Sequence, residues 1–365
     1  MHFRRVFLES FGYTLPDEIV TTAELEQRLA PLYDRLRLPE GRLELMTGIR
    51  ERRFFPPGTR PSTISIESAR RAIEASGIDR RNFGALIHGS VCRDFLEPAT
   101  ACRVHHGVEL PNEAMIYDLS NACLGLLNGI VQVASMIELG QIRAGVVVGT
   151  ECGRELVENT IELLNADTSL TRESVKNSIA SLTIGSASVA VVLCDEELSQ
   201  TGNRLTTAAA YCDTSQHDLC QSRGLQAIMQ TDSEELMRQG IAAGVQTFHR
   251  FLAAAGWEPD DIDRSFGHQV GAAHRKLMLE SLGLAPQNDF ATLETLGNTG
   301  SAALPITMAL GIEQGLLRAN DRVAMLGIGS GINCLMLAVE WQKSSVGSVH
   351  SAATSGGPTI RAGAI

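Results

Sequence analysis

Side chains with useful chemistry occupy comparable places in a sequence that repeats itself. Cys123 and Asn298 each lie seventeen residues before a glycine, Gly140 and Gly315, and each glycine opens a closely similar stretch. Both stretches follow an apolar run of helical character and lead into residues typical of a β-strand. The chain therefore reads as a duplication, with a nucleophilic thiol at one helix start and a hydrogen-bonding amide at the matching one.

A second repeated pattern places a histidine at a strand end. Residues 69–90 and 248–269 both read as a helix, a glycine stop, a short acidic loop and a strand. The strand of the second copy ends at His268. We therefore expect Cys123, His268 and Asn298 to lie at corresponding edges of the repeat and to share one active site between the halves.

Cys123 stands between a predicted strand, 115–119, and a predicted helix, 123–139. A helix start directs free N–H groups and a partial positive charge at this position, and both favour the nucleophilic thiolate. The alternative is a small buried hydrophobic residue, which describes most free cysteines. The other seven cysteines are interpreted as such buried thiols.

The other polar candidates each have an ordinary structural reading as well. His268 is equally typical of a satisfied polar side chain at a strand end. Asn298 is either an N-cap or an amide that donates a hydrogen bond to a developing oxyanion. The glycine-rich stretch 327–333 reads as a tight turn or as a source of backbone N–H groups for a carbonyl oxygen. As a phosphate loop it is weak, because no strand–loop–helix nucleotide signature surrounds it.

Composition excludes several classes of function. The chain has 365 residues, 44% of them hydrophobic, a formal net charge of −11 and a pI near 5.4, which argues against nucleic-acid binding. No apolar run reaches the ~20 residues of a membrane span, and no signal peptide is recognised. The eight cysteines contain no Cys-x-x-Cys pair, which predicts reduced thiols and a cytoplasmic location. His105 and His106 have no suitably spaced third ligand, so no metal is expected.

Strands that alternate with helices predict a layered α/β architecture. We expect an N-terminal half, 1–198, that carries the cysteine and a polar helical insertion at about 153–182. A C-terminal half, 199–342, carries the histidine and asparagine, and a disordered tail occupies 343–365. Among the predicted elements are one helix over 22–37 with Thr22 as its N-cap, a long loop over 213–232 and a strand near 290–293.

The motifs taken together resemble those of the thiolase superfamily. They are Asn-Ala-Cys-Leu-Gly at 121–125, His-Gln-Val at 268–270, Gly-Asn-Thr-Gly-Ser at 297–301 and Gly-Ile-Gly-Ser-Gly-Ile-Asn at 327–333. The Cys–His–Asn set resembles that of ketoacyl synthase III enzymes. Residues 90–98 and 326–334 are similar to the OleA family, whose members join two acyl-CoA chains head to head in bacterial olefin synthesis. The resemblance covers roughly residues 3–342.

This resemblance implies a duplicated, five-layered α-β-α-β-α fold and a homodimer. It also implies that Glu97 enters the partner subunit's site as a base, that Gly331 supplies a backbone oxyanion donor and that Ser330 supports the site. Long-chain acyl-CoA is then the substrate, no metal or redox cofactor takes part, and downstream enzymes of the same pathway are possible partners.

The expected reaction is a non-decarboxylative Claisen condensation through an acyl-Cys123 intermediate. His268 and Asn298 would hold the enolate oxygen, and Glu97 would remove the α-proton. One alternative is decarboxylative condensation with a malonyl thioester, which needs no carboxylate base, so Glu97 distinguishes the two. Others are a condensing enzyme of β-lactone assembly, with the same residues, and a non-catalytic dimer partner of a related synthase.

Overall fold

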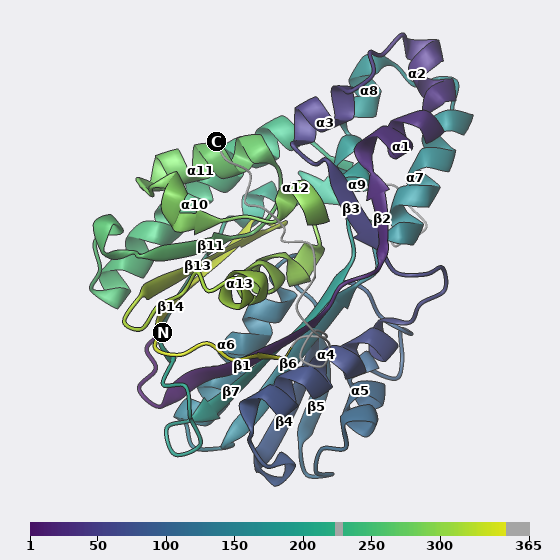
Figure 1. The fold of residues 1–365 in the computed structure, drawn as a ribbon. Helices are drawn as coiled ribbons and strands as arrows, with labels where there is room; N and C mark the ends of the chain where they lie inside the picture. The colour runs from purple at the N-terminus through teal and green to yellow at the C-terminus, as the bar shows by residue number, and fades with distance from the viewer. Residues whose placement is uncertain (223–228, 348–365) are drawn as a thin grey trace.

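The computed structural model describes residues 1–222 and 229–347. Its framework is an eleven-stranded mixed sheet, in which β15 lies beside β1 and the other strands follow the order β12-β11-β13-β14-β8-β1-β7-β6-β4-β5 (Figure 1). The strands are β1 (Val6–Thr14), β4 (Phe83–Gly89), β5 (Met115–Leu119), β6 (Ala144–Glu151), β7 (Ala187–Asp195), β8 (Arg204–Cys212), β11 (Arg264–Gly267), β12 (Asp289–Phe290), β13 (Arg322–Gly329), β14 (Asn333–Glu340) and β15 (Val346–Gly347).

The strand pairing confirms the predicted duplication. In the first half, β4 lies parallel between β5 and β6, and β7 runs antiparallel to both β6 and β1. In the second half, β11 lies parallel between β12 and β13, and β14 runs antiparallel to both β13 and β8. The halves meet where β1 and β8 pair through Phe7 and Arg204.

Apolar residues on both faces of the strands arrange the helices into five layers. In β4, Ala85 and Ile87 belong to the central core with α6 and α13, whereas Leu86 points to the opposite face, against α4 and α5. In β13, Met325 likewise joins the central core and Ala324 packs with α10 and α11. Figure 1 shows α6 and α13 between the two halves of the sheet. These helices are α4 (Pro61–Ser76), α5 (Thr100–Val108), α6 (Gly125–Glu138), α10 (Ser233–Ala255), α11 (Ala272–Leu282) and α13 (Ala303–Glu313).

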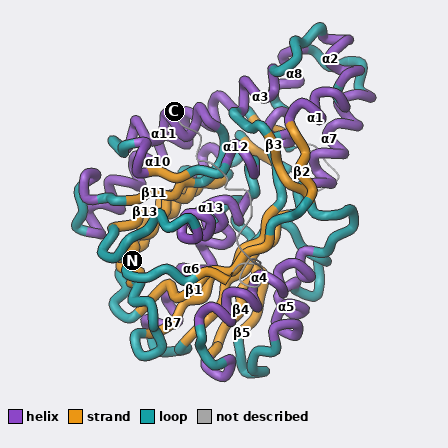
Figure 2. Tube along the Cα trace, in the orientation of Figure 1, coloured by secondary structure: helices purple, strands orange, loops and turns teal. Residues whose placement is uncertain are grey.

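A smaller helical lobe projects from the layered body, at the upper right of Figure 2. It has a separate apolar core, to which Leu25, Leu32 and Val157 contribute. The residues expected to form a helical insertion supply three of its helices. The lobe contains β2 (Glu18–Thr21), α1 (Thr22–Arg28), α2 (Ala30–Leu36), α3 (Arg42–Thr47), β3 (Glu51–Phe54), α7 (Arg154–Ala166), α8 (Arg172–Lys176) and α9 (Ile179–Leu182).

The prediction of a single helix over 22–37 was wrong. The helix is capped by Thr21, whose hydroxyl accepts from the Glu24 backbone N–H, and it stops at Leu29 before α2 begins. Pro31 stands in the first turn of α2, where its missing N–H costs nothing. The same residue would remove a hydrogen bond from the middle of a continuous helix, so the chain restarts there.

Three further expectations need correction. The predicted strand near 290–293 ends at Phe290, and α12 (Leu293–Leu296) follows. Within the predicted loop 213–232, β9 (Cys220–Gln221) pairs with β10 (Gln230–Thr231), and residues 223–228 lie outside the described part. The predicted tail begins with ordered backbone, because β15 pairs with Phe11 and Gly12 of β1; residues 348–365 lie outside the described part.

Candidate active site

Cys123 lies in a tight turn between β5 and α6. The helix begins at Gly125 with Leu124 as its N-cap, so the thiol stands just ahead of the helix and not inside it. The preceding residue, Ala122, has a left-handed backbone with φ of 46°, a conformation that costs energy for a residue with a Cβ. The turn is closed by the Leu124 N–H, which donates to the Asn121 carbonyl oxygen at 2.9 Å.

Burial outweighs the helix start at Cys123. Removal from water raises the pKa of the thiol to about 12, and the carboxylate of Glu151 and the neighbouring Cys220 add to the rise. The N–H groups expected to favour the thiolate still lower this pKa, but the loss of water around the sulfur outweighs them. The thiol must give up its proton as the acyl group arrives.

His268 follows the last residue of β11, and its backbone N–H donates to the Leu326 carbonyl oxygen of the neighbouring strand at 3.1 Å. Burial, and then the nearby His274, lowers the pKa of His268 to about 3. The imidazole is therefore neutral at neutral pH. Its Nδ1 is buried without a hydrogen-bond partner, and in the tautomer that carries the proton on Nε2 this second nitrogen can donate to a substrate oxygen.

The His268 side chain borders a cavity of about 40 Å³ beside β13. Gly327 and Ile328 line the same cavity. A space of this size holds only a few water molecules, so an alkyl chain needs room elsewhere or needs these side chains to move.

Asn298 is fixed by both its backbone and its side chain. Its N–H donates to the Thr183 carbonyl oxygen at 2.9 Å, and its own carbonyl accepts from the Gly185 N–H at 2.9 Å. Asn298 Oδ1 accepts from the Gly300 N–H at 3.0 Å. The N-cap interpretation of Asn298 is wrong, because Thr299 precedes the helical turn 300–302 and Ala302 precedes α13. Because Oδ1 is occupied, the Nδ2 hydrogens are those that can point at a substrate.

Gly331 and Ser330 lie in the turn between β13 and β14, directly beside the Cys123 turn. Gly331 has φ of +132°, and a Cβ added to it would meet Asn333 Nδ2 at 2.4 Å, so only glycine fits. A Cβ added to Gly329, one residue before Ser330, would stand 3.4 Å from the backbone nitrogen of Cys123. The structure thus brings the two turns into contact.

Two residues missed by sequence reasoning connect these parts. Asn333 Nδ2 donates to the Ser330 carbonyl oxygen at 3.0 Å and to Asn121 Oδ1 at 3.3 Å, which ties the β13–β14 turn to the Cys123 turn. Glu151, only 5% exposed, accepts a hydrogen bond of 2.6 Å from the Ser301 hydroxyl. A signal was present for Glu151, since a carboxylate that ends an otherwise apolar strand is unusual.

Glu97 stands apart from the other candidates. It is exposed, in the loop between β4 and α5, beside Phe95 and Leu96, which are 47% and 90% exposed. Among the described residues, no hydrogen bond or ion pair joins Glu97 to Cys123, His268 or Asn298. In the single chain His268 is buried and Cys123 and Asn298 are partly buried, whereas this carboxylate lies at the surface.

Other classes of site find little support in the described part of the chain. No three His, Cys, Asp or Glu side chains gather there as a metal ion would require, and His105 Nε2 lies 3.0 Å from the Pro111 carbonyl oxygen. None of the helices described is both long and apolar enough to cross a membrane.

Comparison with known proteins gives two family matches. Residues 55–153 match the N-terminal domain of thiolase, and residues 252–341 match the C-terminal domain of 3-oxoacyl-[acyl-carrier-protein] synthase III. The first range contains Cys123 and Glu97, and the second contains His268, Asn298 and Gly331. The two matches therefore cover the candidate residues in the order in which the duplicated halves supply them.

Relatives extend these matches over nearly the whole chain. An acyl-CoA:acyl-CoA alkyltransferase of Shewanella oneidensis is 43% identical over 352 residues, which cover 93% of this chain and 100% of the relative. The enzyme of that name from Xanthomonas campestris is 33% identical, with 93% and 100% covered.

Comparison with solved structures gives the same result as comparison with the sequences of relatives. Cerulenin-bound OleA of Xanthomonas campestris superposes with a TM-score of 0.90 at 32% identity and covers 93% of this chain and 98% of its own. A 3-oxoacyl-(acyl carrier protein) synthase III of Xanthomonas oryzae gives a TM-score of 0.89 at 32% identity, with 93% and 100% covered. Fold and full-length identity together establish that the chain belongs to the acyl-CoA:acyl-CoA alkyltransferase (OleA) family of the thiolase superfamily.

Proposed function

We propose that this protein joins two long-chain acyl-CoA molecules head to head, by a non-decarboxylative Claisen condensation that yields a β-ketoacyl-CoA. The observation that carries the proposal is the 43% identity over the full length of an acyl-CoA:acyl-CoA alkyltransferase. The site geometry supports it, because a neutral imidazole and an anchored amide are both hydrogen-bond donors suited to an oxyanion.

The first step is acyl transfer to Cys123. The sulfur forms a bond to the thioester carbonyl carbon, the bond to the coenzyme A sulfur breaks, and coenzyme A leaves as a thiol with the proton. The backbone N–H groups of Cys123 and Gly331 hold the carbonyl oxygen as it becomes negative. The contact between their two turns supports this pairing.

The second step forms the carbon–carbon bond. A carboxylate, which we assign to Glu97 of the partner subunit, removes the α-proton of a second acyl-CoA. His268 Nε2 and Asn298 Nδ2 donate to the enolate oxygen. The carbanion then attacks the acyl-Cys123 carbonyl, and the bond from that carbon to the sulfur breaks. The proton taken by the base returns to the Cys123 sulfur, which restores the thiol and the carboxylate.

A homodimer supplies what the single chain lacks. Glu97 is exposed beside the apolar side chains of Phe95 and Leu96, an arrangement that suits insertion into a second subunit. We further propose that the enzyme acts in the cytoplasm, beside other enzymes of the same pathway that consume its β-keto product.

A single incubation distinguishes the non-decarboxylative condensation from the decarboxylative one. Given one long acyl-CoA alone, the enzyme should release a β-ketoacyl-CoA, or the ketone formed from it by decarboxylation, detected by mass spectrometry. Turnover only after addition of a malonyl thioester would support the synthase III reaction, a reading kept open by the similarity to the Xanthomonas oryzae structure. Failure to acylate Cys123 would support a non-catalytic subunit.

A condensing role in β-lactone assembly uses the same residues and the same first product. It differs in the enzyme that acts next, so a partner pathway reconstituted with this protein would distinguish a β-lactone end product from an olefin.

A further inference from the structure

Glu151 joins three segments that are far apart in the sequence. It ends β6 and is 5% exposed. Its Oε2 accepts from the Cys92 N–H at 3.2 Å, and its Oε1 accepts from the Val91 N–H at 3.1 Å. The same Oε1 accepts from Ser301, through the backbone N–H at 3.2 Å and the hydroxyl at 2.6 Å. One carboxylate thus takes four neutral donors from two loops.

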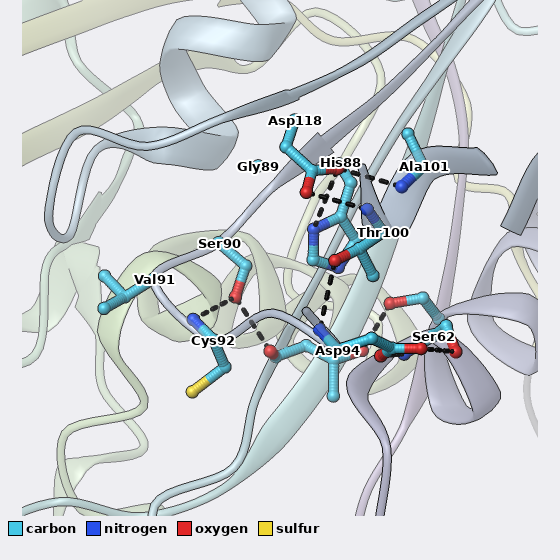
Figure 3. A network of polar contacts seen from close by, with 12 residues as sticks. Ser62, His88, Gly89, Ser90, Val91, Cys92, Asp94, Thr100, Ala101 and Asp118 are labelled. Carbon is cyan, nitrogen blue, oxygen red and sulfur yellow. Dashed lines mark hydrogen bonds and ion pairs between the residues drawn. The ribbon is translucent and has the colours of Figure 1, made fainter. Parts of the chain in front are cut away.

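The first of these loops is the one that carries Glu97. Val91 and Cys92 open it, directly after β4 and Ser90. Farther along, Asp94 accepts from the Ser62 N–H at 2.9 Å and from the Ser62 hydroxyl at 2.5 Å, as Figure 3 shows. Hydrogen bonds therefore hold the loop at Val91, Cys92 and Asp94, and Glu97 remains exposed farther along.

The second loop is the one that carries Asn298. Ser301 follows Gly300, whose N–H holds Asn298 Oδ1. Gly300 has φ of +56°, and a Cβ added there would stand 3.1 Å from Glu151 Cδ. The carboxylate therefore packs directly against the turn that orients the Asn298 amide.

We propose that Glu151 is a positioning residue for the condensation step, where its carboxylate fixes the Glu97 loop and the Asn298 turn relative to one another. The inference rests on the proposed function, since it assumes that Glu97 and Asn298 both serve the carbon–carbon bond-forming step. In a dimer whose subunits exchange Glu97, each Glu151 orders the amide of its own site and the base of its partner's site.

The donor pattern explains why an acid is required and an amide is not enough. All four groups around Glu151 donate hydrogen bonds, and an ionised carboxylate is an acceptor on both oxygens. A glutamine has a single acceptor oxygen, and its NH₂ would face either the Cys92 N–H or the donors of Val91 and Ser301. With the NH₂ toward Val91 and Ser301, those buried donors would lose their partner. With the NH₂ toward Cys92, the Cys92 N–H would keep the Ser90 hydroxyl at 3.2 Å but would face another donor, so the loop would shift in either orientation.

The negative charge of Glu151 opposes ionisation of Cys123, which the acylation step requires. The carboxylate lies near enough to Cys123 to add to the rise in the pKa of the thiol. Loss of the charge should therefore help ionise Cys123, whereas loss of the anchoring should harm condensation. These opposite effects separate positioning from a general loss of structure, which would slow both steps together.

The test compares Glu151→Gln with wild type in two assays. Intact-protein mass spectrometry after brief exposure to one long acyl-CoA gives the rate of acyl-Cys123 formation, and product mass gives the rate of condensation. We expect acylation at the wild-type rate or faster, and condensation slower by about tenfold or more, the usual scale for a misplaced catalytic group.

Glu9→Gln is the matched control. Glu9 is also a buried carboxylate, 2% exposed, and it accepts from neutral donors of Ser199, Gln200 and Thr201, all remote from the proposed chemistry. This variant should lose stability without a change in the ratio of condensation to acylation.

Ser301→Ala removes the hydroxyl, which lies 2.6 Å from Glu151 Oε1 and 2.9 Å from the Gly89 carbonyl oxygen, and keeps the charge of Glu151. It should slow condensation by roughly threefold or more without faster acylation, and it serves as the test if Glu151→Gln fails to fold. Equal slowing of both steps in Glu151→Gln, or unchanged condensation in either variant, would overturn the proposal.

A parallel Glu97→Gln sample separates this inference from the proposed function. If Glu97→Gln blocks condensation while Glu151→Gln does not, only the positioning role is wrong. If Glu97→Gln condenses like wild type, the assignment of the base is wrong and the positioning proposal falls with it.

Discussion

His88 and His268 end corresponding strands of the two halves, yet their surroundings differ. His88, in β4, is fully buried, both ring nitrogens lack hydrogen-bond partners, and its Nδ1 lies 4.0 Å from an Asp118 oxygen (Figure 3). His268, after β11, borders a cavity. Burial lowers the pKa of both imidazoles. In the repeat of 69–90 with 248–269, however, His88 corresponds to Gly267 and Gly89 corresponds to His268. The duplication therefore supplies neighbouring and not equivalent positions, and the two imidazoles enter different surroundings.

The two halves also present different chemical groups at the turns before their central helices. The turn before α6 presents a thiol, whereas the turn before α13 presents an amide whose oxygen is already engaged. In the proposed mechanism, one half supplies the nucleophile and the other supplies neutral hydrogen-bond donors. The variants below separate these contributions, from the largest expected effect to the smallest.

Removal of the Cys123 thiol, the group supplied by the first half, should abolish formation of the acyl-enzyme. Cys123→Ser should reduce condensation to background, because a hydroxyl remains far less ionised than a thiol. Intact-protein mass after exposure to acyl-CoA should show one adduct in wild type, mapped by peptide analysis to Cys123, and none in the variant. An adduct on another of the eight cysteines would contradict the assignment.

Glu97→Gln should block carbon–carbon bond formation and spare acylation of Cys123. The amide keeps the size and polarity of the side chain and removes the proton acceptor. The separate measurement of adduct and product distinguishes the two steps.

The same variant tests the exchange of Glu97 between subunits. A mixed dimer of Cys123→Ser and Glu97→Gln chains should recover about half of the sites if the loop crosses the interface. One site then holds both intact groups and the other holds neither. A verified mixed dimer without activity would place Glu97 in the site of its own chain.

Removal of either hydrogen-bond donor of the second half should reduce the rate of condensation strongly without abolishing it. His268→Ala and Asn298→Ala should each slow condensation by ~10²–10³, the size of effect seen when one oxyanion donor is removed. Acylation should suffer less, because its oxyanion uses backbone N–H groups. If both variants lose acylation to the same extent, these residues activate the thiol instead.

The pH dependence of thiol alkylation tests the balance between burial and the helix start. Only the thiolate reacts, so a pKa of about 12 for Cys123 means that alkylation by iodoacetamide rises about tenfold per pH unit between about pH 7 and pH 10. Peptide mass spectrometry at Cys123 measures the rate. A plateau near pH 8 would show that the helix start prevails over burial.

His88→Leu should have the smallest effect and serves as a comparison for His268→Ala. A neutral, unpaired imidazole is replaced by an apolar side chain of similar size, so no hydrogen bond is lost. Condensation per folded enzyme should stay within about threefold of wild type, with any change confined to the melting temperature. A loss as large as that of His268→Ala would mean that both strand ends serve the reaction.

The sequence alone specified the duplicated pattern and the residues that end its segments. Alternation of apolar runs, glycine stops and short polar loops depends on neighbours along the chain, so strands such as 115–119 and the helix before Gly77 could be predicted. The same local signals marked Cys123, His268 and Asn298, because each interrupts an apolar pattern at a segment boundary.

The tertiary structure decided the properties that depend on distant segments. Loss of water around the sulfur raises the pKa of Cys123, and no local motif predicts how much water a turn will lose. Glu151 and Ser301 share a hydrogen bond although they lie 150 residues apart in the sequence. The strand β15 is formed by pairing with β1, near the other end of the chain. The types and spacing of neighbouring residues are visible in the sequence. Desolvation and long-range hydrogen bonds arise only when the layers pack.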